Sequence, residues 1–255
     1  MRRRQLALLA LALAGCPPAR LVAGGVVPRD EAASTLAQAE VAYAHRPDAT
    51  EVRRAVYLFR TAAASDVSRL EGTVGVLRSV TWLLEHGVRE ERAELVATGL
   101  SAAEQCQQRA PGRPHCDYWE AVARGLGAQE SPATGLGELR PIMALLRRAE
   151  AAMPSLEEGG PSRALAMLLL RAPGWPVGPG DADAALVEAR KALALGPQHP
   201  LNQLAEAEAL AATGDVEGAR AAYRRARGLG EQRAAAGDPD GADYALKAQA
   251  AQERL

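Results

Sequence analysis

Apolar residues recur along most of the chain at steps of three and four positions, and clusters of proline or glycine separate the runs. Such steps place apolar side chains on one face of an α-helix. From Asp30 onward the pattern predicts helices over 30–46, 48–64, 66–86, 89–109, 115–128, 135–152, 161–171, 181–195, 199–213, 215–228 and 230–252. Asp181 and Asp215 suit helix starts, and Gly87 and Gly196 suit helix ends. Short connections and no predicted strand indicate stacked helical hairpins.

Two stretches repeat with an offset of 34 residues: GDADAALVEARKAL at 180–193 aligns with GDVEGARAAYRRAR at 214–227. This period, with small residues and one aromatic position, resembles the tetratricopeptide repeat. The glycine would close the turn between two helices, the alanines would let helices approach, and the aromatic residue would fill the gap between units. The repeat-packing residues are Gly180, Ala185, Ala192, Pro197, Gly214, Ala219, Tyr223 and Ala226.

The match is imperfect in helix 199–213. Glu206 and Ala207 stand where the repeat family prefers a large apolar residue followed by a small one. The earlier helices fit the hairpin arrangement but not the strict signature. The expected fold is an all-α solenoid of tetratricopeptide-like helical hairpins over 30–255, with its best-matched repeats in 166–230.

Composition agrees with a helical fold. Alanine, the best helix former, accounts for 56 of the 255 residues, whereas isoleucine and phenylalanine occur once each and aromatic residues make up 4%. A mainly β fold is excluded, because sheets draw on β-branched and aromatic residues. The net charge of −1 argues against binding nucleic acid through bulk electrostatics, since no basic surplus can neutralise phosphates.

The N-terminus has the layout of a secretory signal: three arginines, a short apolar run and small residues. Leu13-Ala14-Gly15-Cys16 resembles the lipobox of bacterial lipoproteins, which implies a signal peptide over 1–15, lipidation of Cys16 and a tether over 16–29. An ordinary signal peptide with an incidental cysteine is the alternative. The resemblance places the protein in the bacterial cell envelope, anchored by lipid alone and facing the periplasm. Pro17 after the cysteine favours the outer membrane.

Cys106 and Cys116 remain as an even pair in an oxidising compartment, so we expect a disulfide, with two buried free thiols as the alternative. No metal site is expected, because no second ligand pair has zinc spacing. No cofactor is expected, and no nucleophile motif or phosphate loop occurs. The four histidines lie apart and are expected in loops or on the surface: His45, His86, His115 and His199. An enzyme is therefore not expected.

A narrower resemblance covers about residues 115–228. This stretch is similar to the TatT family, the periplasmic T component associated with some TRAP transporters. The matching residues are Gly159-Gly160-Pro161, Arg163, Leu165, Ala172-Pro173-Gly174-Trp175-Pro176, Gly180-Asp181 and Pro197, with Tyr118, Trp119 and Ala121 upstream. The resemblance implies a non-enzymatic solenoid lipoprotein that contacts the solute-binding protein of a TRAP-type transporter. The alternative is a general tetratricopeptide scaffold for cell-envelope or outer-membrane assembly.

The expected activity is binding, because the curved inner face of stacked hairpins presents an extended surface. Trp175 lies between prolines in PGWPVGPG, a segment inserted in what would otherwise be a plain hairpin, and tryptophan is favoured as an interface anchor. The candidate binding surface comprises Trp175, Trp119, Tyr118 and Trp82, with core packing as the alternative for each. The sequence does not decide whether the protein forms a homo-oligomer or whether it binds a small apolar ligand.

Overall fold

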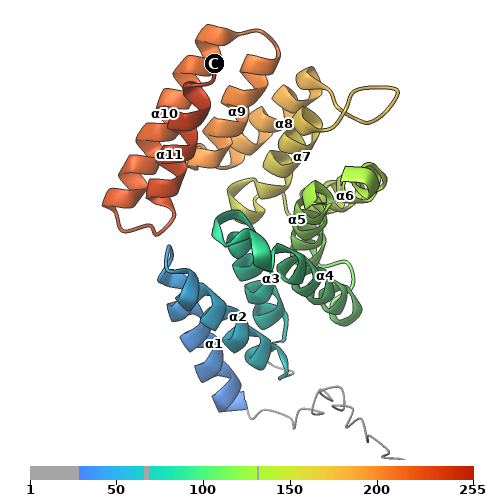
Figure 1. Ribbon diagram of the computed structural model, residues 1–255, viewed down its shortest axis with the longest axis vertical. Helices are drawn as coiled ribbons and strands as arrows, with labels where there is room; N and C mark the ends of the chain where they lie inside the picture. Colours follow the sequence, from blue (N-terminus) through green and yellow to red (C-terminus); the bar gives the residue numbers. More distant parts are fainter. Residues whose placement is uncertain (1–28, 66–68, 131) are drawn as a thin grey trace, which may run out of the picture.

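The computed structural model describes residues 29–65, 69–130 and 132–255, and these residues form eleven α-helices without a β-strand (Figure 1). The helices are α1 Arg29–Ala44, α2 Ala49–Ala63, α3 Arg69–His86, α4 Arg92–Arg109, α5 Pro114–Glu130, α6 Pro132–Ala152, α7 Gly160–Arg171, α8 Ala182–Leu195, α9 Pro200–Ala212, α10 Val216–Ala235 and α11 Gly241–Gln252. Single 3₁₀ turns precede α4 and α7, at Arg89–Glu91 and Leu156–Glu158. Within this part of the chain no helix is both long and apolar enough to span a membrane.

The predicted signal peptide, Cys16 and nearly all of the predicted tether lie outside the described residues. The predicted helices match the observed ones closely except at the end of the chain. The expected helices over 215–228 and 230–252 are wrong, because α10 continues through Gly228 and Gly230 to Ala235 and α11 begins only at Gly241. Gly230 is a packing position against α11, not a helix break.

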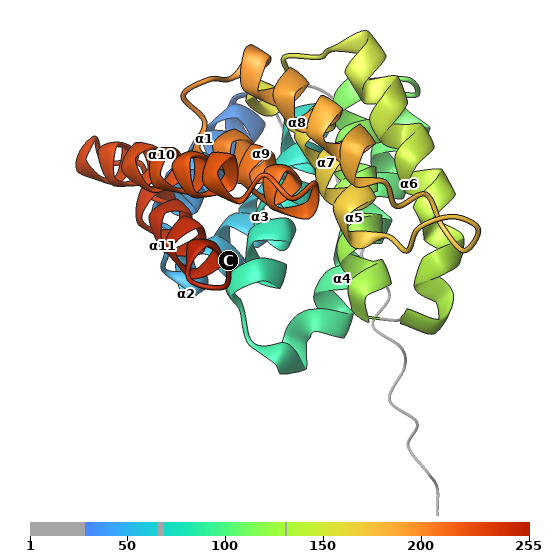
Figure 2. The same cartoon turned by 90° about the horizontal axis from the view of Figure 1, so that it is seen from above.

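The helices form two layers of a curved stack (Figures 1 and 2). Helices adjacent in sequence pack against each other, and each odd-numbered helix also packs on the next odd-numbered helix. Among the described helices, the even-numbered ones do not pack on one another in this way. Because helices converge on the inner side of a curved stack, the odd-numbered helices form the inner layer. The fold is an all-α solenoid of helical hairpins.

The repeated alanines lie where the helices approach most closely. Ala185 and Ala192 of α8 and Ala219 and Ala226 of α10 are completely buried, and Tyr223 is buried beside them. A methyl side chain adds little bulk, so neighbouring helices pack closely at these positions. Pro197 follows α8 as the repeat predicts, but it is exposed. The proline buried at this junction is Pro200, the first residue of α9.

The two repeated glycines serve different purposes. Gly214 adopts a left-handed conformation with φ of 89°, which most side chains disfavour, and it closes the short turn between α9 and α10. Gly180 does not have a positive φ. A Cβ on Gly180 would overlap the carbonyl oxygen of Ala172, so glycine is needed there for a close backbone approach. The expectation that both glycines close the same kind of turn is wrong, since α7 and α8 are joined by a longer loop.

Glu206, the exception in the repeat pattern, lies between two arginines. Its carboxylate lies 3.8 Å from Nε of Arg190 on α8 and 3.6 Å from Nη2 of Arg225 on α10. The two arginines flank α9 from its neighbouring helices. An acidic side chain therefore joins three helices where the repeat family uses apolar contact.

The apolar core is unevenly distributed. The largest cluster spans α1 to α7 and contains Phe59, Leu77, Leu84, Leu146 and Leu165. From α7 onward, the buried clusters consist mostly of alanine, with Leu210 and Tyr223 as their large members. The C-terminal hairpins are therefore thin layers joined by close helix contacts, which is why glycine and alanine positions matter most there.

Candidate interaction surface

The loop between α7 and α8 projects from the body of the solenoid (Figure 1). Its backbone folds back on itself, because the amide of Gly180 donates to the carbonyl of Pro173 at 2.8 Å and the amide of Gly178 donates to that of Gly174 at 3.1 Å. Gly174 and Gly180 also form an isolated bridge. The amide of Asp181 donates to the carbonyl of Leu169 at 3.1 Å and ties the base of the loop to α7. The loop thus has a defined conformation of its own.

Two apolar side chains at the tip of this loop face solvent. Trp175 is 90% exposed and Val177 is 65% exposed. Three prolines and the backbone hydrogen bonds restrict the loop before any partner binds. A loop whose backbone is already ordered loses little conformational entropy on binding, which favours its use to present an anchoring side chain. The alternative that Trp175 packs over the core is excluded by its exposure.

The structure places the other three candidate residues in the interior. Trp82, Trp119 and Tyr118 are each less than 9% exposed, so they do not form a binding surface with Trp175. Trp82 packs with Val52 and Leu83, whereas Tyr118 and Trp119 belong to the large N-terminal cluster, with their rings edge to face at 4.9 Å. The candidate surface is corrected to the loop that carries Trp175. The local sequence did not show whether these three helical residues are buried or exposed, because each of them follows helical spacing.

Polar contacts join the two ends of the solenoid. Nε of Arg46, in the α1–α2 turn, donates to both carboxylate oxygens of Asp240 at 2.9 and 3.1 Å. Nε1 of Trp82 donates to the same carboxylate at 3.1 Å. Figure 1 shows the turn between α10 and α11 facing the turn between α1 and α2. Sequence reasoning missed these residues, and no local pattern marks a contact between positions so far apart.

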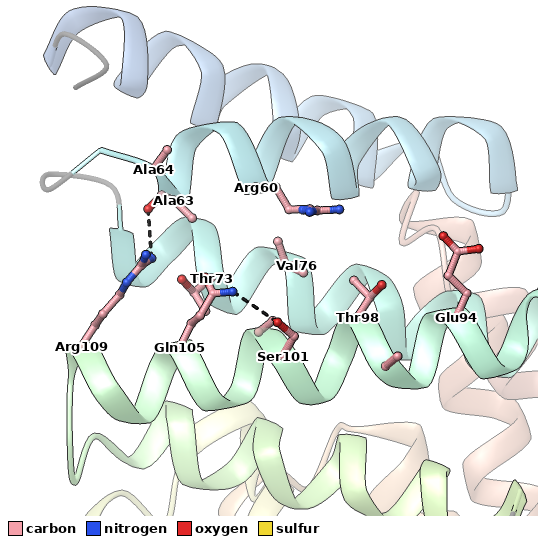
Figure 3. Close-up of a pocket in the computed structure, with 12 residues that line it drawn as sticks. Arg60, Ala63, Ala64, Thr73, Val76, Glu94, Thr98, Ser101, Gln105 and Arg109 are labelled. Carbon is pink, nitrogen blue, oxygen red and sulfur yellow. Dashed lines mark hydrogen bonds between the residues drawn. The ribbon is translucent and has the colours of Figure 1, made fainter. Parts of the chain in front are cut away.

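A surface groove of about 490 Å³ lies between α2 and α4, with α3 as its floor (Figure 3). Arg60 and Glu94 lie on its walls, and Arg109 donates to the carbonyl of Ala63 at 3.3 Å at one end. The remaining lining combines hydroxyl, amide and small apolar groups: Ala63, Ala64, Thr73, Val76, Ala97, Thr98, Ser101, Ala102 and Gln105. This mixed lining differs from the apolar chamber that a small apolar ligand would occupy.

Two histidines have structural roles. Nδ1 of His199 accepts a hydrogen bond from the amide of Leu201 at 3.2 Å and caps α9. His199 lies in the loop between α8 and α9, as expected, and it is buried there. Burial, with smaller contributions from Arg163 and Arg233, lowers the pKa of His199 to about 3, so its ring is neutral. His86 stacks on Trp82 with ring centres 4.4 Å apart.

Cys106 of α4 and Cys116 of α5 form a disulfide across the turn between these helices. Asp117, next to Cys116, accepts hydrogen bonds from Arg148 at 2.7 and 3.0 Å and from Gln107 at 2.8 Å. The disulfide and this buried carboxylate together tie α4, α5 and α6. In the part of the chain that the structure describes, no three His, Cys, Asp or Glu side chains gather as they would around a metal ion.

No protein-family model matches the chain, and no curated protein matches it. Among solved structures, the crystal structure of a thermophilic TPR protein of Thermus thermophilus is similar, with a TM-score of 0.64 and 18% sequence identity. The match covers 88% of this chain and 100% of the other. The fold of this chain is tetratricopeptide-like. At this identity the likeness shows the arrangement of helices alone.

Proposed function

We propose that this chain is a non-enzymatic binding scaffold, held at a bacterial membrane by lipid on Cys16 and facing the periplasm. We further propose that it acts as a TatT-like component that associates with the solute-binding protein of a TRAP-type transporter. The tetratricopeptide-like fold supports the scaffold role. The similarity of residues 115–228 to the TatT family, through the loop that carries Trp175, supports the choice of partner.

The exposure of Trp175 on an internally hydrogen-bonded loop carries this proposal. A tryptophan that packs on nothing contributes little to folding, and its exposed ring is unfavourable in water. At an interface the same ring buries a large apolar area in a partner pocket, and tryptophan dominates the binding energy at many such interfaces. Asp181 and Asp183, both exposed at the base of the loop, favour a basic rim around that pocket.

Site-specific photo-crosslinking in cells tests the proposal. A photoreactive phenylalanine analogue replaces Trp175, and in a matched chain it replaces Leu246, which is 65% exposed on α11. We expect a TRAP-type solute-binding protein to be crosslinked from position 175 and not from position 246. Recovery of outer-membrane assembly proteins from position 175 would favour the general scaffold instead. Equal crosslinking from both positions, or none from 175, would contradict the role of the loop.

Membrane attachment is tested separately. We expect Cys16→Ser to move the protein from the membrane fraction to the soluble periplasmic fraction, because a stable anchor needs the acyl chains on that cysteine. Trp175→Ala serves as the control and is expected to stay with the membrane. An unchanged distribution of Cys16→Ser would contradict the lipid anchor and leave the crosslinking result unaffected.

A further inference from the structure

The contacts between the two ends of the solenoid are made by polar side chains and not by packed helices. Every closely packed helix pair in the described residues lies within two helices of each other in sequence, and none joins α1–α3 to α10 or α11. The ends meet through Arg46 and Trp82 on one side and Asp240 on the other. Such a contact can separate while each hairpin keeps its own core.

A second group of side chains extends the contact to α11. Nζ of Lys247 lies 2.8 Å from Oε2 of Glu85 on α3 and 2.9 Å from Oδ2 of Asp243. Nε2 of His86, the last residue of α3, lies 3.2 Å from Oδ2 of Asp243. The charges therefore alternate across the junction, with Asp243 between a lysine and a histidine.

His86 is placed so that both of its ring nitrogens face acceptors. Nδ1 lies 2.9 Å from the carbonyl oxygen of Trp82, which can only accept, so Nδ1 carries a hydrogen. Nε2 is buried, and no well-aligned hydrogen bond reaches it in the described structure, although the Asp243 carboxylate lies beside it. A neutral ring with its hydrogen on Nδ1 presents a lone pair to that carboxylate. A doubly protonated ring donates to both acceptors.

We propose that these contacts form a latch between the two ends of the solenoid, and that protonation of His86 strengthens the latch. Closure brings the carboxylate of Asp243 beside the ring, so the closed state holds the proton more tightly than the open state. When the latch opens, the inner face between the first and last hairpins becomes accessible. This inference concerns the chain alone and does not depend on the proposed partner.

The direction of the pH dependence follows from the groups around the ring. The interaction with Asp243 raises the pKa of His86, against the opposing effect of burial. When the pKa of a base is higher in the closed state than in the open state, its protonation stabilises the closed state. This stabilisation is complete at pH values below the open-state pKa. It disappears as the pH rises through the closed-state pKa. The latch is therefore strongest in mild acid and weakens toward neutral and alkaline pH.

Asp243 and Lys247, the charged groups beside the ring, keep their charge over this range. Burial acts to raise the pKa of Asp243, but His86 and Lys247 lower it. Burial acts to lower the pKa of Lys247, but Glu85 and Asp243 raise it. Asp240 contacts both Arg46 and Trp82, and Arg92 of α4 donates to the carbonyl of Leu84, two residues before His86. His45, exposed next to Arg46, is the other histidine near the junction.

Distance measurements between spin labels test the latch. The full chain carrying Cys16→Ser, with its disulfide intact, is labelled at Tyr57→Cys on α2 and Leu246→Cys on α11, both exposed positions. We expect one short distance near about pH 5 and a second, longer one that grows toward about pH 8. A shift of one pKa unit between the states changes the open-to-closed ratio about tenfold. A distance distribution that does not change with pH would overturn the proposal.

Two variants identify the groups responsible. The glutamine of His86→Gln cannot titrate, so the distance distribution of this variant should not change with pH. If the variant responds to pH as the parent chain does, the titrating group is His45 or another residue, and the proposal is overturned. Asp240→Asn weakens the contact with Arg46 and should populate the longer distance severalfold more at every pH. If Asp240→Asn keeps the helical circular dichroism and also the short distance alone, the ends are not held by this latch.

Discussion

Gly230 of α10 lies so close to the backbone of α11 that a Cβ atom at this position would be 2.6 Å from the amide nitrogen of Ala245. No side chain fits at that distance without moving the two helices apart. The glycine that looks like a helix break in the sequence is thus what allows the last hairpin to pack. Gly228, two residues earlier, has no atom within 4 Å of the same hypothetical Cβ.

Alanine substitutions at these two glycines should have opposite effects. We expect Gly228→Ala to stabilise the protein by about 0.5–1 kcal/mol, because alanine lowers the entropy cost of the helix. Gly230→Ala should destabilise it by about 1–3 kcal/mol, because overpacking separates α10 from α11. Urea unfolding followed by circular dichroism measures both. Two stabilising substitutions would show that α10 and α11 do not pack as closely as the structure indicates.

Asn202 joins four segments and should tolerate few replacements. Its Nδ2 lies 2.8–2.9 Å from the carbonyl oxygens of Glu158, Ala192 and Gly196, and its Oδ1 accepts from Arg163 at 2.7 Å. We expect Asn202→Asp to cost more stability than Asn202→Ala, because a carboxylate would face carbonyl oxygens in a buried site. Thermal unfolding shows which variant is less stable. The expected loss of unfolding free energy for Asn202→Ala is about 2–3 kcal/mol. Gln198→Ala, at an exposed neighbouring position, is the control and should change little.

Alanine substitutions of Trp82 and Trp175 should affect different properties: the first should lower the unfolding free energy, and the second should weaken partner binding. Trp82→Ala should cost about 3–5 kcal/mol, because it leaves a cavity and removes a hydrogen bond to Asp240. Trp175→Ala should change the unfolding free energy by less than about 0.5 kcal/mol, because the side chain is almost fully exposed. Denaturant unfolding and partner pull-down, both carried out on each variant, distinguish the two effects. A large loss of stability in Trp175→Ala would mean that the loop packs on the core.

His199 should make the protein sensitive to acid. Its folded-state pKa of about 3 is below that of an unfolded histidine, so the unfolded state binds the proton more readily. The stability is therefore fully present above the unfolded pKa of about 6.5 and is lost as the pH falls toward the folded one, by up to about 1.4 kcal/mol per pH unit. His199→Asn keeps a capping side chain and should be less sensitive to acid. Unfolding midpoints measured from neutral to acidic pH compare the two chains, and equal slopes would contradict the assignment.

Much of the fold was predictable because its signals are local. Helical spacing of apolar residues, Asp181 and Asp215 as caps, and the 34-residue offset all operate within one or two turns or between neighbouring hairpins. In a solenoid each unit contacts mainly its neighbours, so local patterns determine most of the architecture. The buried alanines Ala185 and Ala219 were predictable for the same reason.

Long-range packing decided the features that the sequence did not predict. The exposed fraction of Trp82, on a helix, and of Trp175, in a loop, depends on which other segments reach each ring, and the sequence left core packing and binding open for both. Gly180 and Gly214 occupy equivalent repeat positions but meet different surroundings, since only one follows a long loop. The contact of Arg46 with Asp240 joins residues 194 positions apart, and it exists only because the accumulated curvature of the hairpins returns the last helices to the first. The sequence by itself therefore determined a helical, repeating fold, whereas the tertiary structure decided which residues face solvent and how the ends meet.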